Sequence, residues 1–365
     1  MITSNTNRRV AWLTSLPAPY RFPVWNELAF SSNLQIYFTN GRNNKRGWDI
    51  PEVCDWKSKF MDKKIFYFGE AQIIPNPFGF FGICRKSDVV IIGGGWEVPI
   101  HFMTAIWARL TRKHLLIIAE STLESHRFRG KIFKFLRRCF FNLANIILTV
   151  GHSSTESVKA CGIDDNKIKQ LFNPVDSEYF LRNSKQLRKL YSKGHKFLCV
   201  GRLIPIKNFH ATILAFKRIH SADDSLTIVG DGPEKSFLQK LIEDLNLTNH
   251  VFLVGEKNQS ELIEYYANAH TVVMASTNEV WGMVASEALS SGCHVVVSNV
   301  AGITSSIDRM RGVFVCSTDI ESISVHMSIS SKNYKGPITN PEILKYSPQV
   351  FAQGIIDAIE KVTKL

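Results

Sequence analysis

Short apolar runs alternate with amphipathic stretches along the whole chain, in a regular order. The apolar runs are nearly continuous and rich in β-branched residues, which is typical of strands buried on both faces. Strands that alternate with helices predict parallel sheets with helices on both sides. The expected strands cover residues 10–15, 34–40, 87–95, 114–120, 144–151, 196–201, 225–230, 250–255, 271–276 and 294–300.

The same pattern fills both halves of the chain, so we expect two doubly wound, Rossmann-like α/β domains. A length of 365 residues also suits two domains. A polar and basic stretch separates two strand-like runs at residues 176–196. We therefore expect an N-terminal domain over residues 1–180 and a C-terminal domain over 181–346. A last helix, at about residues 347–365, follows a polar loop.

The composition indicates a folded protein with a basic first half. Hydrophobic residues make up 45% of the chain, which supplies enough apolar material for two cores and argues against disorder. Of the net charge of +12, residues 1–180 contribute +9 and residues 181–365 contribute +3. This excess favours an acidic partner for the first domain, such as anionic lipid or a phosphorylated acceptor. No nucleic-acid-binding motif accompanies the charge, so we expect no nucleic acid.

The seven cysteines are scattered singly, with no Cys-x-x-Cys pair and no Cys/His cluster at metal-ligand spacing. This usage fits reduced thiols and argues against a disulfide framework or a zinc site. The N-terminal run lacks the apolar length of a signal peptide, and no stretch of about 18 apolar residues predicts a membrane-spanning helix. We therefore expect a cytoplasmic protein.

The run GRLIPIKN places Gly201, Arg202 and Lys207 at the end of the strand at residues 196–201. Open α/β sheets bind ligands at the carboxyl ends of their strands. Glycine lets a backbone approach a ligand, the Arg202 guanidinium can fork across phosphate oxygens, and Lys207 adds a compact positive charge. This loop therefore suits a diphosphate, and an ordinary solvated loop is the alternative interpretation.

Two carboxylates, Glu279 and Glu287, follow the strand at residues 271–276 with seven residues between them. Gly282 precedes a predicted helix that carries Glu287, and the positive end of that helix can attract a phosphate. A carboxylate can accept hydrogen bonds from two vicinal hydroxyls, so the pair suits a polyhydroxylated ligand. Two solvated acids at a helix entry are the alternative.

The run NEVWGMVASEALSSG resembles the E-x7-E signature of retaining glycosyltransferases of family 4, which have the GT-B fold. The resemblance implies that Glu279 contacts the transferred sugar and acts in catalysis, and that Glu287 holds the ribose. It also implies that Arg202 and Lys207 hold the donor diphosphate, and that the region of Glu256 borders the base. The sequence departs from the commonest E-G-F-G form by reading Glu279-Val280-Trp281-Gly282.

The first domain carries a second element of the same resemblance. The run SLPAPYRFPVW resembles the P-Y-R loop of a subset of the family, which borders the cleft, so Tyr20 and Arg21 are candidates for acceptor or phosphate contacts. Gly94 ends another strand and is a candidate for lining the cleft. Glu120 stands where family members often have a catalytic histidine, and His126 follows six residues later. A carboxylate there can orient the acceptor or take its proton, or it can cap a helix.

Basic and apolar residues recur at helical spacing from Ser125 to Leu143. We expect a helix here whose basic face, within residues 127–138, can meet an anionic membrane surface. The alternative is a core helix with a solvated basic face, and the two interpretations are compatible.

The resemblance implies a retaining glycosyltransferase that moves a sugar from a UDP- or GDP-sugar donor to a glycan or lipid-linked acceptor, as in surface polysaccharide synthesis. We expect no metal and no cofactor, and a location in the cytoplasm that can include the inner membrane face. The alternatives are a GT-B nucleotide-sugar epimerase or phosphorylase, or a non-catalytic nucleotide-binding protein at the membrane surface. The sequence does not identify the sugar, the base, the acceptor or the oligomeric state.

Overall fold

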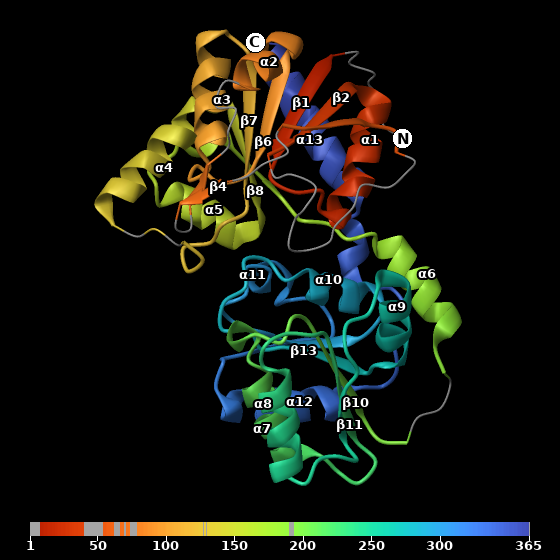
Figure 1. The fold of residues 1–365 in the computed structure, drawn as a ribbon. Coiled ribbons are helices and arrows are strands. Elements are labelled where there is room, and N and C mark those ends of the chain that lie inside the picture. The colour runs from red at the N-terminus through yellow and green to blue at the C-terminus, as the bar shows by residue number, and fades with distance from the viewer. Residues whose placement is uncertain are drawn as a thin grey trace. The chain divides into compact units, whose positions relative to one another are not determined.

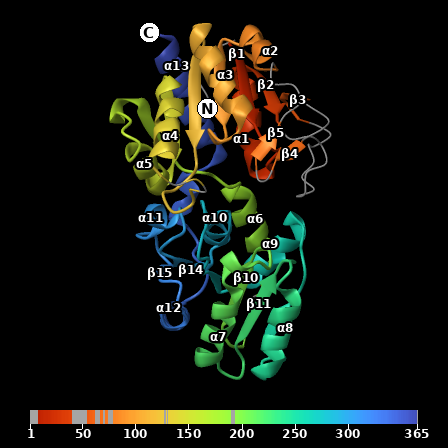
Figure 2. The ribbon, with the colours of Figure 1, turned by 60° about the vertical axis from the view of Figure 1, so that its left-hand side comes forward.

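The chain divides into two α/β units in a computed structural model that describes residues 8–39, 54–61, 66–68, 71–73, 79–126, 128, 130–189 and 193–364. Unit 1 comprises residues 1–173 together with 348–365, and unit 2 comprises residues 174–347. Figures 1 and 2 show that each unit has its own sheet with helices on both faces. Each unit therefore buries its own core.

Unit 1 is built on a parallel sheet of seven strands in the order β3-β2-β1-β6-β7-β8-β9. The chain runs outward from β1 to β2 and then returns to β6 on the other side of β1. The connection after β1 therefore leads to one side of the sheet, and the connection after β6 leads to the other side. Doubly wound sheets bind ligands between two such strands. The strands are β1 Arg9–Thr14, β2 Asn33–Phe38, β3 Lys57–Phe60, β6 Val89–Gly93, β7 His114–Ala119, β8 Ile146–Val150 and β9 Ile168–Leu171, and an antiparallel hairpin joins β4 Phe66–Phe68 to β5 Ala71–Ile73.

Two groups of helices cover the unit 1 sheet. Helices α2 to α5 pack on one face, where their apolar side chains meet alternate residues of the central strands. Helix α13, at the end of the chain, lies beside α1 on the other face (Figure 1). Gly354 lets α13 lie close to the sheet, because a Cβ there would lie 2.5 Å from Cδ2 of Leu171 in β9. The helices are η1 Pro19–Arg21, α1 Phe22–Ser31, α2 Gly79–Lys86, α3 Pro99–Leu110, α4 Lys131–Leu143, α5 Gly151–Lys159, η2 Asp165–Lys167 and α13 Pro348–Thr363.

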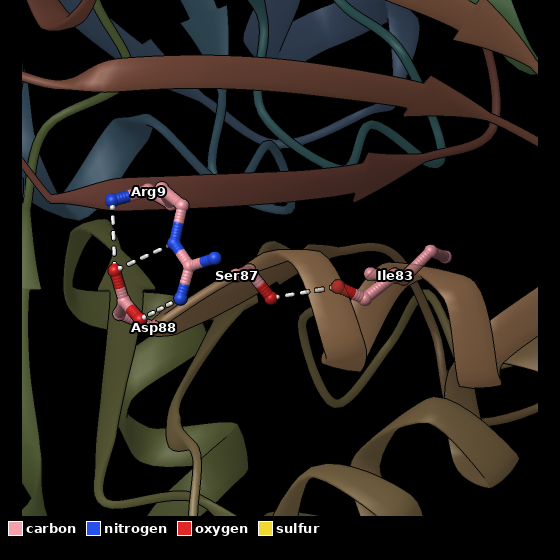
Figure 3. Close-up of polar contacts among 4 residues, drawn as sticks. All are labelled: Arg9, Ile83, Ser87 and Asp88. Carbon is pink, nitrogen blue, oxygen red and sulfur yellow. Dashed lines mark hydrogen bonds and ion pairs between the residues drawn. The ribbon is translucent and has the colours of Figure 1, made fainter.

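The amino ends of β1 and β6 are joined by a forked ion pair, which Figure 3 shows together with the end of α2. Arg9 Nη2 donates to Asp88 Oδ1 at 2.7 Å, and Arg9 Nε and the backbone N–H of Arg9 both donate to Oδ2. The hydrogen bonds from Arg9 hold the pKa of Asp88 below its usual range. Ser87 Oγ donates to the carbonyl of Ile83 at 2.8 Å and so stabilises the last turn of α2. These contacts fix where β6 begins.

Unit 2 repeats the architecture with a parallel sheet of six strands in the order β12-β11-β10-β13-β14-β15. Helices α7, α8 and α12 cover one face, and α6, α9 and α10 cover the other (Figures 1 and 2). Strands β10 to β12 are added in one direction across the sheet and β13 to β15 in the other, so the order of strands reverses between the parallel neighbours β10 and β13. The elements are α6 Ser177–Leu187, β10 Lys196–Val200, η3 Pro205–Lys207, α7 Phe209–Ile219, β11 Ser225–Val229, α8 Lys235–Asp244, β12 Val251–Leu253, α9 Gln259–Asn268, β13 Thr271–Met274, α10 Met283–Ser290, β14 His294–Ser298, α11 Thr304–Ile307, β15 Val313–Cys316, α12 Ile320–Asn333 and η4 Glu342–Lys345.

The first boundary between the units lies after Asn173, earlier in the chain than the boundary at residue 180 that we expected. The reason is α6, whose N-cap Asp176 accepts a hydrogen bond from the backbone N–H of Tyr179 at 3.0 Å. This helix packs on α9 and α10 and therefore belongs to unit 2.

Helix α4 also differs from expectation, because it begins at Lys131 rather than near Ser125. Gly130 precedes it with a φ of +112°. Arg127, which we placed on the basic face of this helix, lies outside the described residues. Among the described residues, no helix combines the length and the apolar character needed to cross a membrane.

Histidines gather at the amino ends of the unit 2 strands. His195, His270 and His294 surround the ring of Tyr334, with ring centroids 5.5, 4.6 and 5.1 Å from it. His195 Nε2 lies 2.8 Å from Thr271 Oγ1. Burial lowers the pKa of His195 to about 3 and that of His270 to about 4, so both rings are neutral near pH 7.

Candidate functional site

Glycines at the carboxyl ends of β10 and β11 shape the loop that carries the predicted phosphate-binding residues. The backbone N–H of Gly201 donates to Val229 O at 2.9 Å. A Cβ on Gly230 would lie 1.9 Å from Gly201 O, and Gly230 has a φ of +146°, so only glycine fits there. The backbone N–H of Leu203 donates to Asp231 O in the loop after β11, and the backbone N–H of Glu234 in the same loop donates to Leu203 O. The course of the loop after β10 is therefore fixed by the neighbouring strand.

Lys207 and Glu279 form an ion pair at the ends of β10 and β13, which are adjacent strands. Their side chains are 18% and 19% exposed, so the pair is largely withdrawn from water while remaining accessible. The backbone N–H of Thr277 donates to Ile206 O at 2.9 Å and ties the two loops together. Asn208 adds hydrogen bonds from its side chain to the carbonyls of Ala275 and Thr318. The fold thus brings together two residues that the sequence placed in one site.

The segment that carries Glu279 is held on its other side by residues 301–303. Glu279 forms an isolated parallel bridge with Ala301, and the backbone N–H of Gly302 donates to Glu279 O at 3.0 Å. Gly282 caps α10 with a φ of +116°, and a Cβ there would lie 2.5 Å from the Cε atom of Met274. The amino end of α10, with its partial positive charge, therefore lies at the carboxyl edge of the sheet.

Glu287 lies on α10, half-buried, and its Oε2 accepts a hydrogen bond of 2.7 Å from the hydroxyl of Tyr266. Burial raises the pKa of Glu287, and the hydrogen bond from Tyr266 opposes that rise. Tyr266 comes from α9 and is fully buried. No sequence motif pointed to Tyr266, because its role depends on the packing of two helices.

Two other predicted donor residues lie in the solvent. Arg202 is exposed directly after Gly201, at the same sheet edge as Lys207. Glu256 is exposed after β12, which is an edge strand of the sheet. Arg202 therefore lies in the same loop as Lys207, whereas Glu256 lies two strands away from β10.

In unit 1, Arg21 and Glu120 form an ion pair beside a cavity of about 190 Å³. Their side chains are 6% and 38% exposed, so the arginine is buried and the carboxylate is accessible. The guanidinium lies 5.2 Å from the ring centroid of Tyr20 and 4.9 Å from that of Phe351. The cavity lies at the carboxyl ends of β1, β6 and β7 and is lined by Trp12, Thr14, Ser15, Leu16, Ala18, Tyr20, Arg21, Gly93, Ile118 and Glu120.

The remaining two predicted residues of unit 1 lie elsewhere. A Cβ on Gly94 would lie 2.3 Å from Cε1 of the buried His101, so this glycine makes room for a side chain, while its neighbour Gly93 lines the cavity. His126 Nε2 lies 3.0 Å from Ser157 Oγ in a different hollow, of about 340 Å³, beneath α4. His126 and Glu120 therefore line two different hollows.

Within the described parts of the chain, no three His, Cys, Asp or Glu side chains gather in a way that could hold a metal ion.

Phe351 was not foreseen in the site, because it lies on the last helix, far along the chain from Arg21. The site residues thus form two groups, one around Lys207 and Glu279 in unit 2 and one around Arg21 and Glu120 in unit 1.

Comparisons with known proteins define the class. The family described as glycosyl transferases group 1 matches residues 182–335. The Campylobacter jejuni protein N-acetylgalactosamine-N,N'-diacetylbacillosaminyl-diphospho-undecaprenol 4-alpha-N-acetylgalactosaminyltransferase is 32% identical over 271 residues, covering 70% of this chain and 71% of that protein. The chain belongs to the group 1 glycosyltransferases, which confirms the transferase class expected from the sequence.

A second relative matches over a shorter part. The O-antigen chain mannosyltransferase RfbU of Salmonella typhimurium is 30% identical over 170 residues, 46% of each protein, so the match spans about half the length of that relative. Among solved structures, HepE of Anabaena in complex with UDP has a TM-score of 0.74 at 16% identity, covering 97% of this chain and 100% of that one. This likeness confirms the predicted fold class, GT-B, with two α/β domains on parallel sheets.

Proposed function

We propose that this chain is a retaining glycosyltransferase of the family 4 type and that unit 2 binds its nucleotide-sugar donor. The observation that carries the proposal is the Lys207–Glu279 pair between β10 and β13, where the order of strands in the unit 2 sheet reverses. A cation there suits the donor diphosphate, and a carboxylate suits the sugar hydroxyls. Glu287, on the helix α10 that follows Glu279, suits the ribose hydroxyls. The spacing of Glu279 and Glu287 supports the assignment to family 4.

The donor we propose is a UDP- or GDP-sugar. HepE, which shares the fold, was crystallised with UDP, which supports a UDP-sugar donor. In the reaction, the bond from the anomeric carbon to the diphosphate breaks and a bond to an acceptor oxygen forms. The leaving diphosphate gains negative charge, which Lys207, Arg202 and the amino end of α10 can stabilise. We propose that no metal ion is needed for this step.

The acceptor we propose is a glycan or a lipid-linked glycan, bound at the unit 1 cavity. Glu120 offers an accessible carboxylate there that can orient an acceptor hydroxyl or take its proton. The basic charge of the first half of the chain supports an acceptor that carries phosphate. The Campylobacter relative, whose name includes diphospho-undecaprenol, supports a lipid-linked acceptor in surface-glycan synthesis.

A lipid-linked acceptor requires access to a membrane, and α4 offers a surface for it. Ile132 and Phe135 are 73% and 63% exposed on the first turns of this helix, beside the exposed cations Lys131, Lys134 and Arg138. Exposed apolar side chains can enter the lipid interface, and each nearby cation adds about 1 kcal/mol on an anionic surface. We propose that α4 holds the protein peripherally on an anionic membrane.

The membrane proposal is tested by flotation with vesicles of phosphatidylglycerol and of phosphatidylcholine. The chain should float with the anionic vesicles alone, and the double substitution of Ile132 and Phe135 by Ser should abolish this. Phe30→Ser is the matched control, because Phe30 is also exposed in unit 1, at 68%. Equal flotation of the double variant and the control would refute a role for α4.

The transferase proposal is tested first by a binding screen of UDP-, GDP-, ADP- and dTDP-sugars, followed by transfer assays with and without EDTA. Glu279→Gln and Lys207→Ala should abolish transfer while the far-UV circular dichroism spectrum is retained. Near-wild-type turnover in both variants would refute the site. Conversion of the donor sugar without any acceptor would instead identify an epimerase. Loss of transfer in EDTA, restored by a divalent cation, would refute metal independence.

A further inference from the structure

The hydroxyl of Tyr266 is the polar group that α9 directs at Glu287. It donates to Glu287 Oε2 at 2.7 Å. The whole tyrosine has an exposed fraction of 0%, whereas Glu287 is half-buried and reaches solvent. A ligand at the sheet edge can therefore touch Glu287 and cannot touch Tyr266. Any effect of Tyr266 on a ligand must pass through the carboxylate.

Neighbouring residues hold Tyr266 in one place. Its ring meets Phe180 of α6 edge to face, with centroids 5.9 Å apart and planes at 77°. Its backbone carbonyl accepts a hydrogen bond from Cys293 Sγ at 3.2 Å, just before β14. The ring is thus packed against α6, and the backbone of the same residue is tied to the segment just before β14. A hydrogen bond from such a fixed group sets the direction of the carboxylate it meets.

The contact with Tyr266 engages only one of the two carboxylate oxygens of Glu287. Oε2 is occupied by Tyr266, and Oε1 has no hydrogen-bond partner among the described residues. Burial by itself favours the protonated acid, and the donated hydrogen bond favours the carboxylate, which is the form that accepts from hydroxyls. Tyr266 therefore acts on both the orientation and the charge of Glu287.

We propose that Tyr266 is a positioning residue that holds Glu287 ready to accept hydrogen bonds from the ribose hydroxyls of the donor. The inference rests on the proposed function of unit 2 and extends it to a residue outside the motif. It predicts that a fully buried phenol, which no ligand touches, controls how strongly the protein distinguishes a ribose from a deoxyribose.

The test is Tyr266→Phe, which removes one oxygen and keeps the ring. Affinities for UDP, 2′-deoxy-UDP and 3′-deoxy-UDP are measured by titration calorimetry, or for the corresponding GDP or ADP series if that nucleotide binds the wild type. A hydrogen bond to a charged group contributes about 1.5–3 kcal/mol, of which an indirect effect retains part. We therefore expect UDP to bind about five- to tenfold more weakly to the variant. The deoxy analogue that lacks the contacted hydroxyl should bind the variant almost as tightly as it binds the wild type. The ratio of the affinity for UDP to that for this analogue should therefore fall by the same factor.

Two comparisons separate positioning from a structural role. Tyr265→Phe is the matched control, because Tyr265 is the next residue toward the start of α9 and lies in a groove on the β10 and β11 side. It should leave the preference unchanged. In a Glu287→Ala background, Tyr266→Phe should have no further effect on UDP affinity, because its action passes through the missing carboxylate.

The outcomes distinguish the two levels of the proposal. Nucleotide binding with an unchanged ribose preference in Tyr266→Phe would overturn the inference and leave the proposed function intact. A further loss of affinity in the Glu287→Ala background would also overturn it, since the tyrosine would then act through the fold. Failure of UDP, GDP and ADP all to bind the wild type would overturn the proposed function itself, and the inference with it.

Discussion

Neutralising Glu279 should strengthen the binding of a nucleoside diphosphate while weakening the recognition of the sugar. In the free protein, Glu279 occupies Lys207, the residue that we assign to the diphosphate. A diphosphate must therefore share Lys207 with a carboxylate or displace it, and the two anions repel each other. Glu279→Gln removes the competitor, keeps the shape of the side chain and leaves Lys207 available.

The size of the effect follows from the burial of the pair. Exposed ion pairs contribute about 0–1 kcal/mol, whereas truncating one partner of a fully buried pair costs about 3–5 kcal/mol. With 18% and 19% exposure, the Lys207–Glu279 pair lies between these limits, and we take about 1–2 kcal/mol for it. Since about 1.4 kcal/mol corresponds to a factor of ten, UDP should bind the variant roughly five- to thirtyfold more tightly.

The UDP-sugar should not share this gain, because it loses its hydrogen bonds to Glu279. A hydrogen bond to a charged group contributes about 1.5–3 kcal/mol, which cancels or exceeds the electrostatic gain. Calorimetric titration of UDP and the UDP-sugar against wild type, Glu279→Gln and Lys207→Met checks the reasoning. Lys207→Met should weaken both ligands, and Glu243→Gln, an exposed site on α8 with the same change of charge, should alter neither. Unchanged or weaker binding of UDP to Glu279→Gln would refute the argument.

Three further predictions concern unit 1, pH and backbone space. Arg21→Lys keeps the charge beside Glu120 and loses the planar stacking, so transfer to the acceptor should fall about tenfold or more while the Kd for the donor stays constant; a change in the donor Kd alone would contradict this. Because the pKa of His195 is lowered to about 3, the unfolded chain takes up a proton below about pH 6.5 that the folded chain refuses. The free energy of unfolding should therefore be independent of this group above that pH, and should fall by up to about 1.4 kcal/mol per pH unit below it. His195→Gln should flatten this slope when the free energy of unfolding is measured by urea titration between about pH 7 and pH 5. Gly230→Ala should cost at least about 2 kcal/mol in the free energy of urea unfolding, while Gly82→Ala, which meets no atom within 4 Å, should not destabilise the chain.

All but one of the strands that the sequence predicted lie inside their sheets, and the exception is the edge strand β12. The middles of these runs, such as residues 89–92 and 295–297, are continuously apolar because helices cover both faces of those strands. The strands β3, β9 and β15 were not predicted, and each lies at the edge of its sheet. Lys57–Phe60 reads Lys-Ser-Lys-Phe, which is mostly exposed and polar. Such a strand is defined by its hydrogen bonds to a neighbour, and no local pattern records them.

The same distinction applies to the candidate sites. Lys207 and Glu279 are found from the sequence because each lies a few residues after a buried strand, and strand ends can be read locally. Glu287 is found because it follows Glu279 at a recognisable spacing on a predicted helix. Tyr266 and Phe351 have no such signal, because each reaches its site from a helix whose apolar side faces the core. Their side chains look like ordinary core residues until the packing brings a hydroxyl to Glu287 or a ring to Arg21.

The two ion pairs suit different tasks because their cations differ. Arg21 is 6% exposed and held between two rings, so its planar guanidinium has little freedom to leave Glu120. Lys207 ends in a compact ammonium on a flexible stem, and 18% of its side chain is exposed. An anionic ligand can therefore take Lys207 from Glu279 far more easily than it can take Arg21 from Glu120. We infer that the unit 2 pair exchanges partners when a diphosphate binds, whereas the unit 1 pair stays intact and presents the free edge of Glu120 to the acceptor.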